Sequence, residues 1–348
     1  MACGLLGRHW GIRTDMRIVV TGASGNVGSA VVRAAVGSGA EVIGVVRRTP
    51  TERAAPAGTQ WVRCDIGSLH ADAVLRAAME GADAVVHLAW AIQPSHDRRL
   101  LARTNVLGTT AVIEAAERAG VPHLVHASSV GVYSAGPKDR TVREDWPTDG
   151  IPTSSYSRDK VTAELLLDAA SIPVVTRIRP ALVVQRRAAS ELLRYFLPAL
   201  ARPLVKAKLP ILPLPDRTVT QVVHADDVAD AVLRILATRA PGAFNLAPEP
   251  PLRPDDLAAA FGGRRVPLPA KLLRAGASAT WNTHLQPVDV GWVDLLLESP
   301  LLDSSRARDE LGWAPRYDTH EALADVVAGL RAHAGDRSPL LRPLRLFA

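Results

Sequence analysis

The stretch from Arg17 to Gly28 constrains the fold of this chain most, because it joins a short apolar run to a glycine-rich turn. Residues 18–20 predict a buried parallel strand, and residues 27–38 have the apolar periodicity of a helix. A strand, a glycine turn and a helix in this order predict a dinucleotide site, because a side chain on the turn would keep a pyrophosphate from the helix N-terminus. The glycines follow the pattern Gly-x-x-Gly-x-x-Gly rather than Gly-x-Gly-x-x-Gly, so a tight turn without a ligand stays an alternative.

The end of the second predicted strand bears on the choice of dinucleotide. Glu41 to Val46 is apolar after its first residue and is followed by Arg47 and Arg48. An acid at this place would accept hydrogen bonds from the ribose 2′-hydroxyl of NAD, whereas arginine would pair with the 2′-phosphate of NADP. Two arginines and no acid favour NADP(H) over NAD(H); a solvated surface pair is the alternative.

Strand and helix patterns alternate along the first half of the chain. Strands are predicted over residues 61–65, 83–89, 123–127 and 173–179, and helices over residues 69–80 and 97–119 and from Tyr156 to Leu167. This alternation predicts an α/β fold, a doubly wound parallel sheet of the Rossmann type with a smaller C-terminal substrate-binding lobe.

The character of the chain changes after Pro180. Residues 191–214 are apolar and rich in proline, which predicts a cap or substrate lid; a membrane-surface helix is the alternative, and Pro198, Pro203 and Pro210 disfavour it. We therefore predict an N-terminal extension over residues 1–15, a dinucleotide-binding core over 16–180, a mainly substrate-binding lobe over 181–335 in which 218–247 return to the core, and a tail over 336–348.

Composition restricts the partners. The formal net charge of +6 over 348 residues comes without a long basic block, which argues against a nucleic-acid partner. Cys3 and Cys64 suggest no disulfide framework and fit a reducing compartment. No apolar run is long enough to span a membrane. We expect a cytoplasmic protein with a small-molecule substrate and no metal site.

Three further residues make the pattern specific. Ser129 follows the fifth predicted strand, and Tyr156 and Lys160 lie four residues apart on one helix face. With the glycine turn, they resemble the short-chain dehydrogenase/reductase superfamily. The chain length, Asn105, and the stretches 223–229 and 312–315 are similar to its extended branch, the NAD-dependent epimerase/dehydratase family, over about residues 16 to 332.

The resemblance implies a catalytic set. Tyr156 would exchange a proton with a carbonyl or alcohol, Ser129 would hold the reacting oxygen, and Lys160 would bind the nicotinamide ribose. A free phenol has a pKa of about 10, and a nearby ammonium group would lower it. The alternatives are an exposed helix-surface pair for Tyr156 and Lys160 and a strand-end cap for Ser129.

The resemblance also assigns residues to the ligands. The cofactor would contact Gly22, Ser24, Gly25, Asn26, Val27, Gly28, Arg47, Arg48, Asp65, Ile66, Leu88, Ala89, Lys160 and Pro180. Trp90 and Val130 would contact the substrate. Asn105 would order the helix beneath the site or cap a helix start. Family members are often dimers through helices like those at Asp97 and Tyr156, which leaves a homodimer open.

Departures from the family pattern narrow the chemistry. Sugar-nucleotide 4,6-dehydratases of this family carry an Asp-Glu pair directly after the active-site hydroxyl, where this chain has Val130 and Gly131, so dehydration is disfavoured. Thr220 stands where sugar-nucleotide enzymes often place a diphosphate-binding arginine, although Arg217 is near.

These observations favour an NADP(H)-dependent reductase or dehydrogenase acting on a largely apolar ketone, aldehyde or alcohol. In character it is closest to the dihydroflavonol-reductase-like carbonyl reductases. The alternatives are an NAD-dependent sugar-nucleotide epimerase and a non-catalytic dinucleotide-binding regulator.

Overall fold

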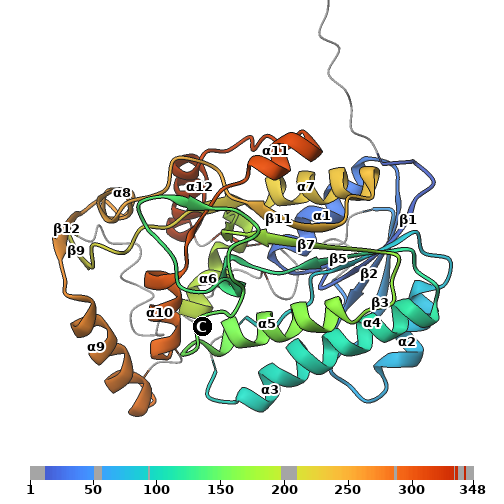
Figure 1. Cartoon of the computed structure of the whole chain (residues 1–348), viewed down its shortest axis with the longest axis horizontal. Helices are drawn as coiled ribbons and strands as arrows, with labels where there is room; N and C mark the ends of the chain where they lie inside the picture. The colour runs from blue at the N-terminus through green and yellow to red at the C-terminus, as the bar shows by residue number, and fades with distance from the viewer. Residues whose placement is uncertain are drawn as a thin grey trace, which may run out of the picture.

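The computed structural model describes residues 12–50, 57–92, 95–196, 210–285, 288–332, 334–335 and 341. Seven parallel strands form its central sheet in the order β3-β2-β1-β4-β5-β7-β11 (Figure 1). The strands are β1 (Arg17–Thr21), β2 (Glu41–Val46), β3 (Thr59–Arg63), β4 (Ala84–His87), β5 (His123–Ala127), β7 (Val174–Pro180) and β11 (Gly242–Leu246). From β1, in the middle of the sheet, the chain runs to β3 at one edge, returns to the middle with β4 and then runs to β11 at the other edge. This path makes the fold the predicted doubly wound α/β fold.

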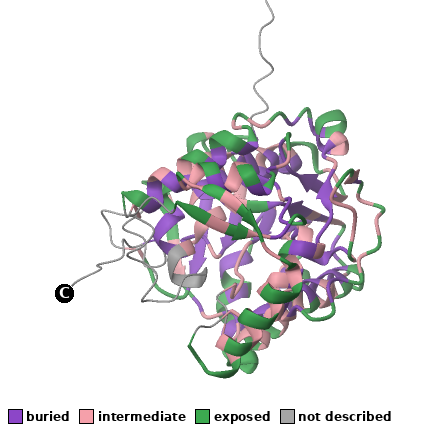
Figure 2. Cartoon of the chain, turned by 90° about the vertical axis from the view of Figure 1, so that its left-hand side faces the viewer, coloured by how far each residue is buried: buried purple, intermediate pink, exposed green. Residues whose placement is uncertain are grey.

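Helices cover both faces of this sheet. One face carries α1 (Asn26–Gly37), α7 (Ala225–Thr238) and α11 (Ser305–Leu311); the other carries α2 (Ala71–Met79), α4 (Gly108–Arg118) and α5 (Ser155–Asp168). Because both faces are covered, buried residues follow one another along the central strands without alternation, and in Figure 2 these strands form the buried centre of the molecule.

The remaining elements lie mostly beyond the carboxyl ends of the strands, on the left of Figure 1. They are α3 (Arg98–Ala102), the π-helical segment η1 (Arg103–Leu107), η2 (Val130–Val132), β6 (Thr141–Val142), β8 (Leu182–Val184), η3 (Arg186–Ala188), α6 (Ala189–Phe196), β9 (Ile211–Leu214), β10 (Val222–His224), α8 (Pro254–Ala260), β12 (Arg264–Pro267), α9 (Ala270–Asn282), α10 (Val290–Glu298), β13 (Leu301–Leu302) and α12 (Thr319–Arg331).

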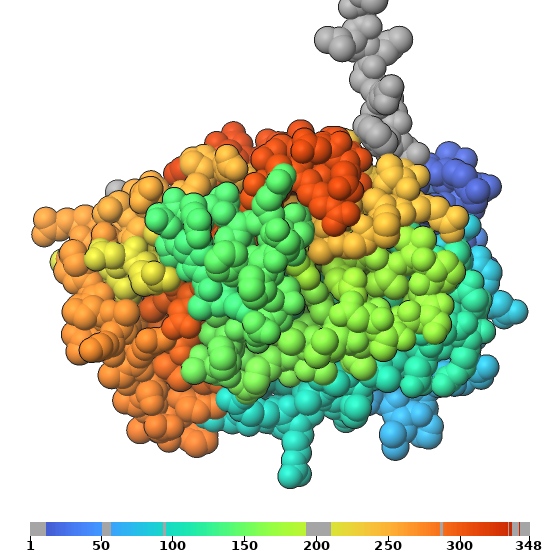
Figure 3. Space-filling view, viewed as in Figure 1, coloured from blue at the N-terminus to red at the C-terminus, as the bar shows by residue number. Residues whose placement is uncertain are grey.

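The segment that follows β5 bridges the sheet and the C-terminal part. β6 pairs in parallel with β13, and the Gly136 N–H donates to the Glu298 carbonyl at 2.9 Å. In Figure 3 this green segment is packed directly against the orange C-terminal residues. A division of the chain near residue 180 stays a prediction.

Most predicted elements are present, with shifted ends. The third strand begins two residues earlier than expected and ends at Arg63. Of the apolar stretch 191–214, residues 197–209 lie outside the described residues, and so do residues 1–11 and most of the tail, so the cap, the extension and the tail stay predictions.

Candidate active site

The glycine turn between β1 and α1 is shaped to receive an anion. Gly22 has φ +69°, and a methyl group added there would lie 2.7 Å from the Ala89 backbone. A methyl group at Gly28 would overlap the Gly22 carbonyl oxygen. Within the described chain, the N-cap of α1, Gly25, makes no side-chain capping hydrogen bond, so first-turn N–H groups remain for a phosphate.

The six predicted cofactor residues of this turn are therefore together, but they do not all face the same way. Asn26 Nδ2 donates to the Val183 carbonyl at 2.9 Å, and Gln185 Nε2 donates back to the Asn26 carbonyl at 2.6 Å. These bonds turn the Asn26 side chain toward β8, so it ties the turn to the C-terminal part.

The predicted adenosine residues follow β2 and β3. Arg47 and Arg48 are exposed immediately after β2. Asp65 accepts a hydrogen bond from the Gly67 N–H at 3.2 Å, and Ile66 is buried against Gly108. These positions lie at the carboxyl edge of the sheet, beside the glycine turn, as a dinucleotide site requires.

Leu88, Ala89 and Pro180 lie at the same edge. The Leu88 N–H donates to the Thr21 carbonyl at 3.2 Å, so the end of β4 runs beside the end of β1. Pro180 is buried at the end of β7. The structure therefore brings the predicted cofactor residues that follow β1, β2, β3, β4 and β7 to one edge of the sheet.

Ser129, Tyr156 and Lys160 converge on this edge. Ser129 is buried after β5, and its hydroxyl accepts the Gly131 N–H at 3.0 Å. Tyr156 and Lys160 occupy the first turns of α5, which Ser154 caps through a 3.3 Å bond from the Ser157 N–H. The Lys160 ammonium is buried and donates to the Ala127 carbonyl at 2.6 Å. An exposed helix-surface pair is excluded.

The electrostatics of Tyr156 differ from the expectation. Burial raises the pKa of Tyr156 to about 12, and a hydrogen bond with Ser129 opposes that rise. Lys160 does not lower this pKa here, because its ammonium group is directed to Ala127. Burial also lowers the pKa of Lys160 well below its ordinary value, against the attraction of Glu164 and Asp159.

Trp90 covers the lysine. The Lys160 Nζ lies 3.3 Å from the centre of the indole ring, a cation–π contact, and the ring meets Tyr156 edge-on at 6.3 Å. The indole Nε1 is buried and has no hydrogen-bond partner among the described residues. Trp90 is thus beside Tyr156 and Lys160, whereas the other predicted substrate residue, Val130, packs with Val132 and Tyr133 instead.

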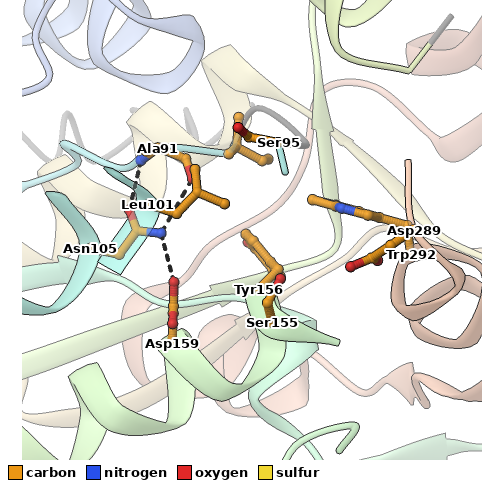
Figure 4. Close-up of a pocket in the computed structure, with 10 residues that line it drawn as sticks. Ala91, Ser95, Leu101, Asn105, Ser155, Tyr156, Asp159, Asp289 and Trp292 are labelled. Atoms are coloured by element: carbon orange, nitrogen blue, oxygen red, sulfur yellow. Dashed lines mark hydrogen bonds between the residues drawn. The ribbon is translucent and has the colours of Figure 1, made fainter. Parts of the chain in front are cut away.

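A small pocket opens over Tyr156 (Figure 4). It is lined by Ala91, Ile92, Ser95, Leu101, Asn105, Ser155, Tyr156, Asp159, Asp289 and Trp292. Trp292, from α10, lies 5.3 Å from the Tyr156 ring. Each side of the pocket contributes one aromatic ring and one carboxylate: Tyr156 and Asp159 from α5, and Trp292 and Asp289 from α10 and its N-cap.

Asn105 shapes the core side of this pocket. Its side chain accepts the Ala91 N–H at 2.8 Å and donates to Asp159 at 3.0 Å. It lies within η1, inside the continuous helical run from α3 to α4, so it does not cap a helix start; Asp97 caps α3. π-helical turns often occur at functional sites, and here the turn places Asn105 between Ala91 and Asp159 of α5.

The sequence reasoning missed Asp159, Asp289 and Trp292. Asp159 directly precedes Lys160, so its position three residues after Tyr156 on α5 was the available signal. The apolar residues 290–298 predict a buried helix, but only the tertiary fold shows that this helix faces Tyr156.

The stretches 223–229 and 312–315, which carried part of the resemblance, support each other outside the pocket. The Trp313 indole donates to the Asp227 carbonyl at 2.9 Å, and the Asp227 carboxylate accepts the Arg316 N–H at 2.9 Å. Their role in this structure is to fix α7 against the loop before α12.

The Rossmann sheet, the glycine turn and the serine, tyrosine and lysine at its edge form the arrangement that the sequence predicts for a nicotinamide-dinucleotide site. Residues 18–247 match the model of the NAD dependent epimerase/dehydratase family. The chain belongs to this family, which supports a nicotinamide dinucleotide as its cofactor. Among the described residues, no helix is long and apolar enough to cross a membrane.

Individual relatives cover the chain at low identity. "Uncharacterized protein Rv2047c" of Mycobacterium tuberculosis is 28% identical over 92% of this chain, which spans only 31% of that relative. A dTDP-glucose 4,6-dehydratase of Streptomyces griseus is 29% identical over 93% of this chain and 97% of its own length. The solved structure of MoeE5 with UDP-glucuronic acid and NAD has a TM-score of 0.68 at 22% identity, covering 91% of this chain and 99% of that one.

Proposed function

We propose that this protein is a sugar-nucleotide epimerase that uses NAD and exchanges hydride at one carbon of the sugar. The observation that carries the hydride-transfer assignment is the convergence of Ser129, Tyr156 and Lys160 beside the glycine turn. The sugar-nucleotide assignment is supported by the family and by the dehydratase and MoeE5, whose names specify nucleotide sugars, and NAD in the case of MoeE5.

The residues of the chain divide the work at the reacting carbon. A bound nicotinamide ring would supply or accept the hydride. Tyr156 would hold the proton that moves to or from the substrate oxygen, and Ser129 would donate a hydrogen bond to the same oxygen. A phenol with its ordinary pKa of about 10 is protonated at neutral pH. Burial raises the pKa of Tyr156 to about 12, so the free site holds the proton that a reduction step needs.

Accepting a proton from an alcohol needs a lower phenol pKa. Lys160 could supply this if its ammonium group approached the phenol from its present position under Trp90. Dehydration remains disfavoured, because Val130 and Gly131 carry no group that transfers a proton.

The second candidate is the NADP(H)-dependent carbonyl reductase. Arg47 and Arg48 are both exposed after β2, where a guanidinium group would pair with a 2′-phosphate. An apolar carbonyl substrate would also explain the aromatic walls formed by Trp90 and Trp292.

One experiment separates the two candidates. The purified protein is denatured and the released nucleotide identified, and the native protein is then incubated with UDP-glucose and, separately, with NADPH and a panel of aryl and alkyl ketones. Released NAD and an isomerised UDP-sugar, without net coenzyme consumption, support the epimerase. No bound nucleotide and consumption of NADPH support the reductase.

A further inference from the structure

Two carboxylates line the pocket over Tyr156, and they come from opposite sides of it. Asp159 lies on α5, and Asp289 is the N-cap residue of α10. In Figure 4 they flank the Tyr156 ring. Each has one oxygen held by the protein: Asn105 donates to Asp159 Oδ2 at 3.0 Å, and Arg98 donates to Asp289 Oδ2 at 2.9 Å.

The second oxygen of Asp289 is unsatisfied. The Asp289 side chain is 11% exposed and the residue as a whole 8%, and its Oδ1 is buried with no hydrogen-bond partner among the described residues. A buried acceptor without a donor is costly, so such an atom at a pocket wall indicates a ligand that brings the donor.

The described residues of the pocket offer no unpaired cation that could bind a negatively charged ligand. The described lining contains neither lysine nor arginine. Arg98 is paired with Asp289, and Lys160 is directed to the Ala127 carbonyl beneath Trp90. A carboxylate on the substrate would meet two carboxylates here and no free counter-charge.

We propose that Asp159 and Asp289 form a donor-accepting subsite, which selects a substrate ring with hydroxyl or ammonium groups beside the reacting carbon and rejects one with a carboxylate. This subsite rests on the proposed sugar-nucleotide function and adds its specificity. For a nucleotide sugar, it selects a neutral or amino sugar over a uronic acid.

The test measures binding rather than turnover. Calorimetry with saturating NAD gives dissociation constants for UDP-glucose, UDP-glucosamine and UDP-glucuronic acid with the wild type, Asp289→Asn and Asp159→Asn. Asp168→Asn is the matched control: it removes the same charge from α5 at an exposed residue paired with Arg177. Thermal unfolding shows whether each variant is folded; because Asp289 also pairs with Arg98, Asp159→Asn provides a variant that leaves this ion pair intact.

The wild type and Asp168→Asn should bind UDP-glucose and UDP-glucosamine about tenfold or more tightly than UDP-glucuronic acid. Asp289→Asn and Asp159→Asn should reduce this preference, bringing the dissociation constant for UDP-glucuronic acid closer to those for the other two UDP-sugars. Equal binding of UDP-glucuronic acid by the wild type, or an unchanged ratio in both folded variants, would overturn the subsite alone. If NAD binds and none of the three UDP-sugars does, both the subsite and the sugar-nucleotide function are wrong.

Discussion

Lys160 has an ammonium group with two close neighbours, the Ala127 carbonyl and the face of Trp90. Burial lowers its pKa, and burial also raises that of Tyr156, so each residue is held nearer its neutral form. In the free protein, desolvation therefore sets the pKa values of both residues. A change in these pKa values requires that a ligand entering the site alter their surroundings.

Replacing Tyr156 with Phe removes the proton donor while keeping the ring that packs against Trp90 and Trp292. We expect turnover to fall by about 100- to 10,000-fold, the usual contribution of general acid–base catalysis, with dinucleotide affinity unchanged. Steady-state kinetics and calorimetric titration of the same preparations check this. Retained turnover in the variant would remove Tyr156 from the mechanism.

The pKa of Tyr156 can be read directly. In protein free of nucleotide, the ultraviolet difference titration between wild type and Tyr156→Phe should show a phenol that ionises near pH 12, because burial disfavours the phenolate. An ionisation near neutral pH would show instead that Lys160 already acts on the phenol.

At the scale of elements, α1 joins the glycine turn to the core, and its two end glycines have different roles. Gly28 lies in the first turn, where a methyl group would overlap the Gly22 carbonyl, whereas a methyl group at Gly37, in the last turn, would meet no atom within 4 Å. The close approach of the Gly22 carbonyl requires glycine at position 28, whereas position 37 has room for a side chain.

Gly28→Ala should therefore weaken dinucleotide binding about tenfold or more, because the turn must shift to admit the methyl group. Gly37→Ala is the matched control on the same helix and should raise the free energy of unfolding by about 0.5–1 kcal/mol, with binding intact. Calorimetry and urea denaturation of both variants measure these effects. Equal dinucleotide affinity in the two would contradict the role given to the turn.

The elements nearest the glycine turn were predictable, and the substrate side was not. Apolar residues that follow one another without alternation, such as residues 18–20 of β1 and 124–125 of β5, are visible in sequence because both faces of these strands are buried. Tyr156 and Lys160 were found because their helical spacing is local. Asp289 and Trp292 were not, because α10 reaches Tyr156 through long-range packing that no local pattern encodes. The direction of the Lys160 ammonium group could not be predicted from the sequence either, because it depends on contacts with both Trp90 and Ala127.

The whole molecule contains three buried histidines on strands β4 and β5. Burial lowers the pKa of His87 from 6.5 to about 3 and the pKa of His123 to about 4. Burial also lowers the pKa of His126 well below its ordinary value. His87 is held neutral between Thr21 at 2.7 Å and Thr109 at 3.0 Å. The folded protein therefore keeps these rings uncharged.

Stability should accordingly fall with acidification. Below pH 6.5 the unfolded chain binds protons at these histidines and the folded chain does not, so the free energy of unfolding decreases as the pH falls toward 4. The slope is up to about 1.4 kcal/mol per pH unit for each histidine. Urea denaturation across this range measures it, with His70→Gln, at an exposed histidine, as a control that should keep the slope. A flat profile would show that the buried histidines are charged in the folded state.

We expect the glycine turn and the sheet edge at Tyr156 and Lys160 to form one site for a nicotinamide dinucleotide. The most direct measurement is calorimetric titration of nucleotide-free protein with NAD, NADH, NADP and NADPH. We expect one dinucleotide to bind per chain, NAD for an epimerase or NADP for a reductase, and we expect weaker binding in Gly28→Ala. Failure of all four to bind the folded wild-type protein would contradict this expectation.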